Sequence, residues 1–190
     1  MRNVLLLMFV LMLTASLAVA QTNRVGLFGV ANPTTDADCN IVDAAPGLLP
    51  VYAVHVQDAP GGPTMIASQF KSAIPACFTG TWLSDTAIYP VTVGNSQNGV
   101  AIGYGVCIAT PVHVLTINVF ASGTTPACCV WPVEGDPNIP SGQVEFVDCD
   151  NALLVGVGQS GIINADGTCP CADIVAVEDA TWGKIKALYN

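Results

Sequence analysis

Hydrophobic and polar residues alternate along much of the chain with the period of two that is typical of β-strands. The clearest case is segment 99–108, whose predicted inner face has five members: Val100, Ile102, Tyr104, Val106 and Ile108. Segment 112–120 follows with a second apolar stripe, formed by Leu115, Ile117 and Val119. Because only a short Thr110-Pro111 connection separates the two segments, we expect them to pair and to form the centre of the fold.

Shorter strands are expected at 24–30, 51–57, 65–70, 142–149, 152–157 and 161–163, separated by turns rich in Asp, Asn, Gly and Pro. Alternation in segment 51–57 places Tyr52, Val54 and Val56 on one face and puts His55 outside. In segment 65–70, Ile66 and Phe70 are expected to face inwards. With no amphipathic helix before residue 179 and no internal repeat, the pattern predicts an all-β fold, an antiparallel β-sandwich with Ig-like topology.

The first 20 residues have the features of a secretory signal peptide. Arg2 precedes the apolar segment 4–13, and Ala18-Val19-Ala20 predicts cleavage after Ala20. An apolar segment of this length falls well short of the roughly 20 residues that span a bilayer. We therefore expect a secreted, extracellular or periplasmic protein with no membrane association after cleavage, and a β-sandwich domain over residues 21–178.

The closing segment 179–190 differs from the rest of the chain. Thr181 is a suitable N-cap for a short helix, and on helical spacing four apolar residues fall near one side: Trp182, Ile185, Leu188 and Tyr189. Lys184 and Lys186 fall elsewhere on this predicted helix. The segment is expected to dock its aromatic edge on the sandwich or to extend beyond it, with a sorting or assembly tag as the alternative.

Eight cysteines follow the signal segment: Cys39, Cys77, Cys107, Cys128, Cys129, Cys149, Cys169 and Cys171. An even number in an exported chain predicts four disulfides that staple the sandwich. Adjacent Cys128 and Cys129 are expected to bond to two different places rather than to each other. Sequence proximity favours a bond from Cys149 to Cys169 or Cys171, among 105 possible connectivities. Zinc binding by these three cysteines is disfavoured because Cys-x-Cys is tighter than the usual spacing.

Charge excludes some partners. Without Arg2, the chain keeps four cations against 14 acids, a formal charge of 4 − 14 = −10. Such a charge repels nucleic acid. The acids gather in turns, where Asp commonly bonds its own backbone. Calcium is the alternative interpretation of these turns, with five candidate ligands: Asp36, Asp38, Asp148, Asp150 and Asp166. An EF-hand pattern that starts at Asp36 fails, because Ile41 replaces its glycine and Gly47 its bidentate acid.

No catalytic set is evident. The two histidines, His55 and His113, both lie inside strand patterns, and no G-x-S-x-G motif occurs. Residues 156–161 match G-x-G-x-x-G, but a strand and a turn follow instead of the helix that dinucleotide binding requires. We therefore expect neither a catalytic residue nor a cofactor. The alternatives are a carbohydrate-binding module, with stacking candidates Trp82, Trp131, Tyr89 and Tyr104, and a hydrolase that uses carboxylates of the Asp loops.

Several segments resemble a group of uncharacterised secreted bacterial proteins: 25–28 (VGLF), 51–55 (VYAVH), 67–71 (ASQFK), 144–149 (VEFVDC), 169–171 (CPC) and 181–189 (TWGKIKALY). The progression from VYAVHVQ through ASQF to VHVLTINVF is also similar to the strand pattern of cohesin-like sandwiches, whose members bind partner proteins. This resemblance implies a cohesin-like binding module. We therefore expect a secreted, non-catalytic interaction or structural module at or outside the cell envelope, with a protein or a glycan as its partner.

Overall fold

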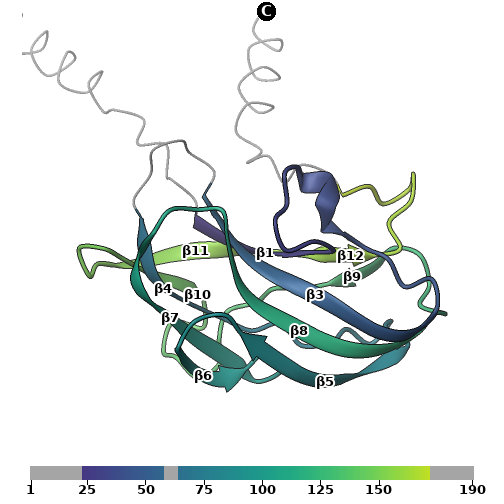
Figure 1. The fold of residues 1–190 in the computed structure, drawn as a ribbon, viewed down its shortest axis with the longest axis horizontal. Helices are drawn as coiled ribbons and strands as arrows, with labels where there is room; N and C mark the ends of the chain where they lie inside the picture. The colour runs from purple at the N-terminus through teal and green to yellow at the C-terminus, as the bar shows by residue number, and fades with distance from the viewer. Residues whose placement is uncertain (1–22, 58–63, 172–190) are drawn as a thin grey trace, which may run out of the picture.

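The computed structural model describes residues 23–57 and 64–171, which fold almost entirely as β-strands (Figure 1). The predicted signal peptide and C-terminal helix lie outside these residues. Within the described part of the chain, no helix is long and apolar enough to cross a membrane. The elements are β1 (Asn23–Phe28), the 3-10 helix η1 (Asp36–Cys39), β2 (Asn40–Ile41), β3 (Pro46–Gln57), β4 (Met65–Phe70), β5 (Gly80–Ala87), β6 (Val91–Asn95), β7 (Gly99–Ile108), β8 (Val112–Ser122), β9 (Cys129–Trp131), β10 (Val144–Asp148), β11 (Leu153–Gln159) and β12 (Gly161–Ile163).

Nine strands form one sheet in the order β5-β8-β3-β1-β11-β10-β4-β7-β6, and β2, β12 and β9 form a second, smaller sheet. The larger sheet folds back on itself, so that β5, β8, β3 and β1 pack against β10, β4 and β7 (Figure 1). The predicted β-sandwich is confirmed. Most pairs are antiparallel as expected, but β1 pairs with β11 and β12 with β2 in parallel.

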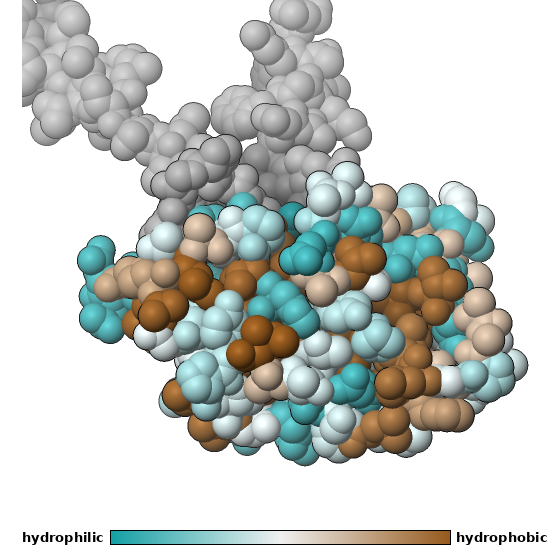
Figure 2. All heavy atoms as spheres, viewed as in Figure 1, coloured by the Kyte–Doolittle hydropathy of each residue, from teal (hydrophilic) through white to brown (hydrophobic). Residues whose placement is uncertain are grey.

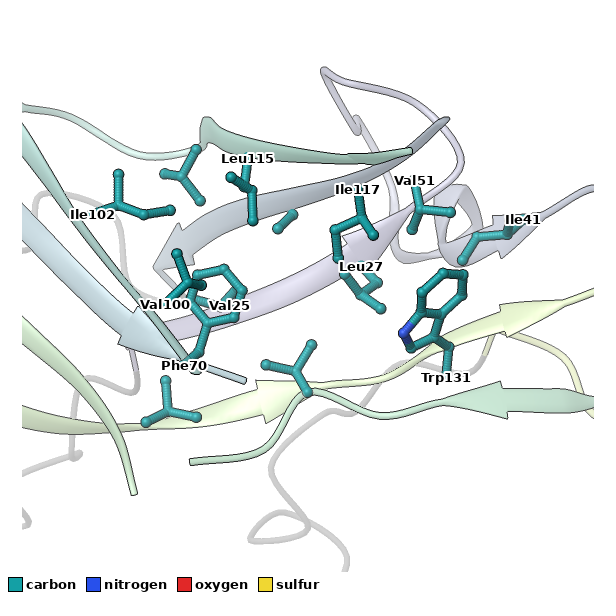
Figure 3. Packing of buried hydrophobic residues seen from close by; sticks show 14 of the residues in the cluster. Val25, Leu27, Ile41, Val51, Phe70, Val100, Ile102, Leu115, Ile117 and Trp131 are labelled. Carbon is teal, nitrogen blue, oxygen red and sulfur yellow. The ribbon is translucent and has the colours of Figure 1, made fainter. Parts of the chain in front are cut away.

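One hydrophobic core fills the space between the two layers (Figure 3). Leu115, Ile117 and Val119 of β8 are fully buried there, as the alternation predicted. Phe70, Val100 and Ile102 reach the same core from the opposite layer, and Trp131 fills the end next to the smaller sheet. A second small cluster lies on the outer side of β1 and β3, where η1 covers Phe28 and Val54.

The expected pairing of segments 99–108 and 112–120 is wrong. Strand β7 pairs with β4 and β6, whereas β8 pairs with β3 and β5, so the two strands lie in opposite layers. The connection at Thr110-Pro111 therefore crosses from one layer to the other. Each strand carries an apolar stripe because each contributes one side of the core, and alternation alone does not tell paired strands from facing ones.

Bulges change which side chains face inwards. Strand β3 has no such bulge: Ala53 and His55 both face inwards, in register with Leu27 and Val25 of β1, so the expectation that His55 lies outside is wrong because it chose the wrong face of this strand. In β4, a register shift relative to β10 makes Ile66 the extra residue, so that Met65 is buried and Ile66 only partly covered. Alternation in β7 ends at Gly105, which has a positive φ, and Val106 is exposed. One extra residue reverses the facing of every residue beyond it.

The two edge strands of the large sheet, β5 and β6, are held together by the carboxylate of Asp85. Its oxygens accept hydrogen bonds from the backbone N–H and the hydroxyl of Ser96, the latter at 2.8 Å, and from the indole N–H of Trp82 at 3.1 Å. Ser96 is fully buried. Pro90 precedes β6, and Gly94, with a positive φ, interrupts the strand, so little of this edge is available to pair with another strand.

All eight cysteines form disulfides: Cys39–Cys171, Cys77–Cys129, Cys107–Cys149 and Cys128–Cys169. Adjacent Cys128 and Cys129 bond to different places, as predicted. The expected bond from Cys149 to Cys169 or Cys171 is wrong, because Cys149 bonds to β7 instead. Cys169 and Cys171 anchor the end of the described chain to the residue before β9 and to η1.

The glycines of the G-x-G-x-x-G sequence have a packing role. A Cβ atom at Gly156 would overlap the Phe146 ring, and one at Gly158 would overlap the Val133 carbonyl group. At Gly161, it would press on Leu27 and Ile41. Close approach of neighbouring elements therefore accounts for the motif, and a strand instead of a helix follows it, as predicted.

Candidate functional site

The acidic turns use their carboxylates to hold their own backbone. Asp38 accepts hydrogen bonds from the N–H groups of Thr34, at 2.6 Å, and Thr35, at 3.1 Å, which lowers the pKa of the Asp38 carboxyl. One oxygen of Asp148 accepts from the N–H groups of Asp150 and Ala152. Asp36 is the first residue of η1, and Asp38 is its third. This turn chemistry is the first interpretation of the Asp clusters, and calcium binding stays an untested expectation.

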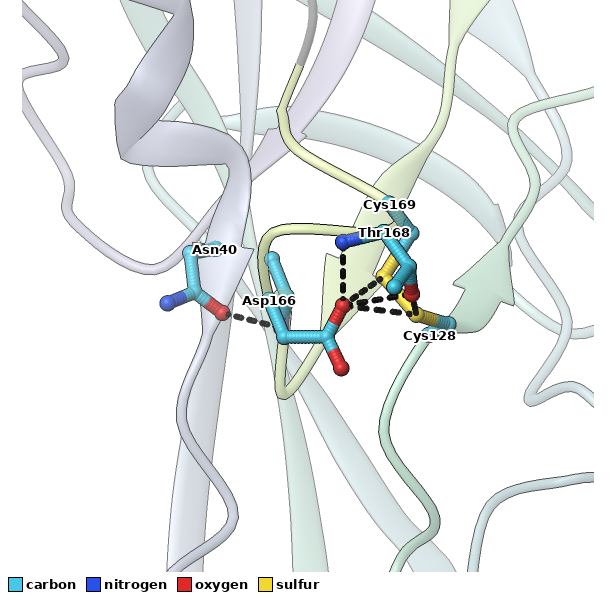
Figure 4. Close-up of a disulfide and its surroundings, with 6 residues drawn as sticks. Asn40, Cys128, Asp166, Thr168 and Cys169 are labelled. Carbon is cyan, nitrogen blue, oxygen red and sulfur yellow. Dashed lines mark hydrogen bonds between the residues drawn. A yellow bond between two sulfur atoms is a disulfide. The ribbon is translucent and has the colours of Figure 1, made fainter.

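Asp166 lies beside the disulfide Cys128–Cys169 (Figure 4). Its Oδ1 accepts hydrogen bonds from the backbone N–H of Thr168 at 2.7 Å and from the Thr168 hydroxyl at 2.6 Å, which lowers the pKa of the carboxyl. In the described residues, Cys128, Asp166 and Cys169 are the one group of three side chains whose potential metal-ligand atoms lie close together. Sulfurs joined in a disulfide are not thiolates, so the group does not offer the donor set that zinc requires.

His55 is sealed in the core, where it stacks on Phe146 with ring centroids 4.4 Å apart. Its Nδ1 lies 3.1 Å from the Tyr104 hydroxyl and its Nε2 lies 3.4 Å from Oδ1 of Asn23. One neutral tautomer satisfies both contacts, with Nδ1 accepting from Tyr104 and Nε2–H donating to Asn23. Burial lowers the pKa of His55 to about 3 and raises that of Tyr104. These groups join the two layers, and none of them meets solvent.

The aromatic residues proposed as carbohydrate platforms are largely inside. Trp131 and Tyr104 are buried, which rules them out as stacking surfaces. Trp82 and Tyr89 are partly covered and pack against the core, and Tyr89 also contacts Tyr104 with ring centroids 4.9 Å apart. The carbohydrate-binding alternative therefore loses two of its four candidate platforms, because composition says which aromatics exist and not which way they point.

Two of the cavities that open on the surface of the described residues are well formed, and no carboxylate lines either of these two. The larger, of about 280 Å³, lies between β1, β3 and the loop before η1 and is bounded by Arg24, Phe28, Pro33, Thr34, Thr35, Val56 and Pro111. The smaller, of about 200 Å³, lies beside the disulfide Cys39–Cys171. The hydrolase alternative requires two converging carboxylates, and neither cavity provides them.

The outer side of β5, β8 and β3 carries exposed apolar side chains on an uncharged surface. In register across these strands, Thr81 pairs with Phe120 and Phe120 with Leu48. Phe120 is 49% exposed and Leu48 is 67% exposed. We call this surface the Phe120 face, defined by the outward residues Leu48, Pro50, Tyr52, Thr81, Ser84, Thr86, Thr116, Asn118 and Phe120. Figure 2 shows hydrophobic residues gathered at the right-hand end of the molecule, where β3 begins and β8 ends.

Neutral hydrogen bonds order the polar side chains of the Phe120 face. Asn118 donates from Nδ2 to the Thr86 hydroxyl at 2.9 Å. Nε2 of His113 lies 3.0 Å from the Thr116 hydroxyl, and the His113 ring meets the Tyr52 ring edge-on. Partial burial lowers the pKa of His113, so its ring is neutral at pH 7 and Nε2 is able to accept from Thr116. These contacts already restrict the side chains that make them, so binding of a partner costs those side chains little further conformational entropy.

Sequence reasoning missed Phe120 and Leu48. Phe120 follows the inward stripe of β8 by one residue, and Leu48 lies in a segment for which no strand was expected. One signal was available: residues 86–133 contain no Asp, Glu, Lys or Arg. Surfaces built from this segment are necessarily uncharged. Depletion of charge is a property of the centres of protein interfaces.

Comparisons with known proteins show cohesin modules as structural neighbours. No protein-family model and no curated protein matches the sequence. The sixth cohesin of Acetivibrio cellulolyticus scaffoldin B, solved with a mutant Cel5 dockerin, is 12% identical, with a TM-score of 0.49 over 76% of this chain and 99% of that one. A type III cohesin of the Ruminococcus flavefaciens scaffoldin ScaE is 6% identical, with a TM-score of 0.49 over 78% and 89%. A non-cellulosomal cohesin of Archaeoglobus fulgidus is 8% identical, with a TM-score of 0.46 over 77% and 93%.

Proposed function

We propose that this protein is an exported, non-catalytic module that binds a partner protein through the Phe120 face, at or outside the cell envelope. Four disulfides support the oxidising compartment, because such bonds persist outside the cytoplasm. The single observation that carries the binding function is the uncharged, hydrogen-bonded Phe120 face, with Phe120 and Leu48 adjacent and exposed.

The arrangement fits a protein interface. Its apolar part is formed by Phe120 and Leu48, and neutral hydroxyl and amide groups surround them. Interfaces combine a desolvated apolar centre, which carries most of the binding energy, with a polar rim. None of the residues of the Phe120 face lines either cavity, and such a surface suits another protein better than a small molecule, which requires a concave site. Glycan binding at the same face is retained as an outcome of the experiment.

The experiment uses residues 21–190 immobilised as bait against the envelope fraction and culture medium of the source cells. Wild type is compared with Phe120→Asp, and Val130→Asp serves as the control because Val130 is equally exposed, on β9. We expect one saturably bound protein that wild type and the control retain. Loss of an interface anchor of this kind costs roughly 2–4 kcal/mol, so Phe120→Asp should weaken binding by about 30-fold to 1,000-fold.

Equal capture by all three baits would overturn the proposal, as would the absence of any saturable protein partner. A bound polysaccharide that survives protease treatment and is lost in Phe120→Asp would assign the same face to a glycan. Melting temperatures of the three baits, measured by circular dichroism, exclude unfolding as the cause of lost binding.

A further inference from the structure

The outer side of the other layer is also largely apolar, but its shape differs from that of the Phe120 face. Strands β11, β10, β4, β7 and β6 lie side by side, and their outward residues form two rows across the sheet. One row is Leu153, Val147, Ala67, Gly103 and Val91, and the other is Val155, Glu145, Gln69, Ala101 and Val93. We call these ten residues the aliphatic face.

The aliphatic face is hollow between two ridges. Leu153 and Val155 form the ridge on β11 and are 62% and 58% exposed, whereas Val91 and Val93 form the ridge on β6. On β4 and β7, three of the four positions are Ala or Gly, so the face is lowest over these two strands, and Val147 and Glu145 of β10 stand between this hollow and the β11 ridge. Glu145 is the one charged residue in the two rows.

The size of this face decides against a second copy as its occupant. With strands about 4.8 Å apart, the two ridges are about 19 Å apart, and two rows of side chains extend about 14 Å along the strands. The resulting area, of the order of 300 Å², is well below the roughly 800 Å² that each partner buries in a stable complex. A single short helix, about 10 Å wide, covers the two rows when it lies across the strands from one ridge to the other.

The described chain ends on the outer side of the sheet, at the Gln159 end of β11, where Cys171 packs against the same cluster as Tyr52 of the Phe120 face. Val25 and Leu27 point into the core, so Phe28 points outwards, and Cys171 packs against the cluster that contains Phe28. Cys171 and Gln159 line the same cavity, and Gln159 pairs with Gly26 of β1. The next outward residue along β11 is Val157, which is exposed, followed by Val155 and Leu153.

The remaining chain has the length and the chemistry to cover the aliphatic face. Residues 172–178 provide a connection of up to about 25 Å when extended, and β11 is about 20 Å long from Leu153 to Gln159. The predicted helix 179–190 would measure about 18 Å, close to the distance between the ridges. Its apolar side offers Trp182 and Ile185. Lys184 and Lys186 are half of the cations after residue 20. They offer a positive partner for the carboxylate of Glu145, which has no cation beside it in the two rows of the aliphatic face.

We propose that residues 179–190 dock within the same chain as a helix on the aliphatic face, with Trp182 and Ile185 in the hollow between the ridges and Lys184 or Lys186 beside Glu145. The docked helix forms a third layer that covers the exposed valines. This occupant is independent of the partner proposed for the Phe120 face, and the two proposals stand or fall separately.

Trypsin provides the test, because residues 21–190 contain only four cleavage sites: Arg24, Lys71, Lys184 and Lys186. Cleavage at Lys184 and Lys186 is followed by mass spectrometry in wild type, in Val155→Asp and in a free peptide of residues 172–190. Proteolysis of a docked segment follows the population of its open form, so we expect wild-type cleavage at least about tenfold slower than in the peptide. Val155→Asp should abolish this protection, and Val93→Asp, on the opposite ridge, should weaken it.

Leu48→Asp is the matched control, because it places the same charge on the Phe120 face and should leave the protection unchanged. A carbodiimide should also join Glu145 to Lys184 or Lys186 within one chain, and Glu145→Gln should prevent that link. Equal cleavage rates in wild type and the free peptide would overturn the proposal. If the carbodiimide cross-links joined only two separate chains, and their yield rose with protein concentration, the proposal would be overturned and a second copy would be the occupant of the aliphatic face.

Discussion

The Phe120 face and the aliphatic face belong to the outer side of one nine-stranded sheet, yet they differ in shape and in order. On the Phe120 face, a large ring projects and hydrogen bonds such as that between Asn118 and Thr86 fix the polar side chains. On the aliphatic face, small residues such as Ala101 and Gly103 leave a hollow between valine ridges. A projecting, ordered surface suits insertion into a separate protein, whereas a short hollow suits a single helix that is already tethered nearby.

The largest effect that should separate the two faces comes from the disulfide Cys39–Cys171, which fixes the start of the C-terminal segment. Replacing both residues by Ser should lower the free energy of unfolding by about 2–4 kcal/mol, since the bond closes a long loop. Tryptic cleavage at Lys184 should accelerate, because the tethered helix loses effective concentration at its site. Binding through the Phe120 face should not change below the melting temperature.

Cys107→Ser/Cys149→Ser is the control for this disulfide. That bond joins β7 to the residue after β10 and does not hold the C-terminal segment. Its loss should lower the melting temperature without exposing Lys184 to trypsin. If both double variants exposed Lys184 equally, tail protection would reflect global stability, and the distinction between the faces would lose its support.

Acid should lower the stability of the whole domain, and so of both faces, because His55 lies in the core under them. Burial holds the pKa of folded His55 to about 3, whereas the unfolded chain has the ordinary value of 6.5. As the pH falls below 6.5, the unfolded chain therefore binds a proton that the folded chain does not. The stability that the neutral ring contributes is complete above that pH and declines by about 1.4 kcal/mol per pH unit towards pH 3.

Urea denaturation between pH 7 and pH 5 measures this effect, before carboxylates such as Asp38 and Asp166 begin to titrate. Wild type should lose about 2 kcal/mol of unfolding free energy from pH 6.5 to pH 5. His55→Gln should start from a lower stability and show a much smaller loss over the same range. A wild-type stability that stays constant over this range would mean that His55 takes up its proton in the folded protein.

The alternation of residues correctly predicted eight of the strands, the β-sandwich and the inward stripe of β8, because burial of one sheet face imposes a period of two, but it did not predict β2, β5, β6 and β9. It failed at Val106, where β7 is interrupted at Gly105, and at His55, where both faces of β3 carry apolar residues and the pattern does not tell which one meets the core. It also failed for strand partners, because β7 and β8 contribute to opposite sides of one core and carry similar patterns.

Neither candidate surface was predicted, for a related reason. Leu48 and Phe120 become neighbours only through the pairing of β3 with β8, over a distance in sequence that no local pattern spans. The two ridges of the aliphatic face come from β6 and β11, which are separated by three strands in the sheet. The separate destinations of Cys128 and Cys129 were predictable, because the geometry of vicinal cysteines restricts them, whereas the partner of Cys149 depended on sheet topology.

The smallest changes in stability are expected at two glycines, Gly80 beside the Phe120 face and Gly103 within the aliphatic face, and the two changes should have opposite signs. At Gly80, a Cβ atom would overlap the Phe120 carbonyl oxygen and the Phe78 ring, so Gly80→Ala has to displace β5 and should cost about 1 kcal/mol. At Gly103, a Cβ atom would meet only the side chain of Val91, 3.4 Å away, in ordinary contact. Gly103→Ala should therefore stabilise the protein by about 0.5 kcal/mol, because alanine loses less chain freedom on folding. Chemical denaturation of both variants measures the two signs. A stabilised Gly80→Ala would mean that the strands under the Phe120 face yield easily, and the order assigned to that face would then be wrong.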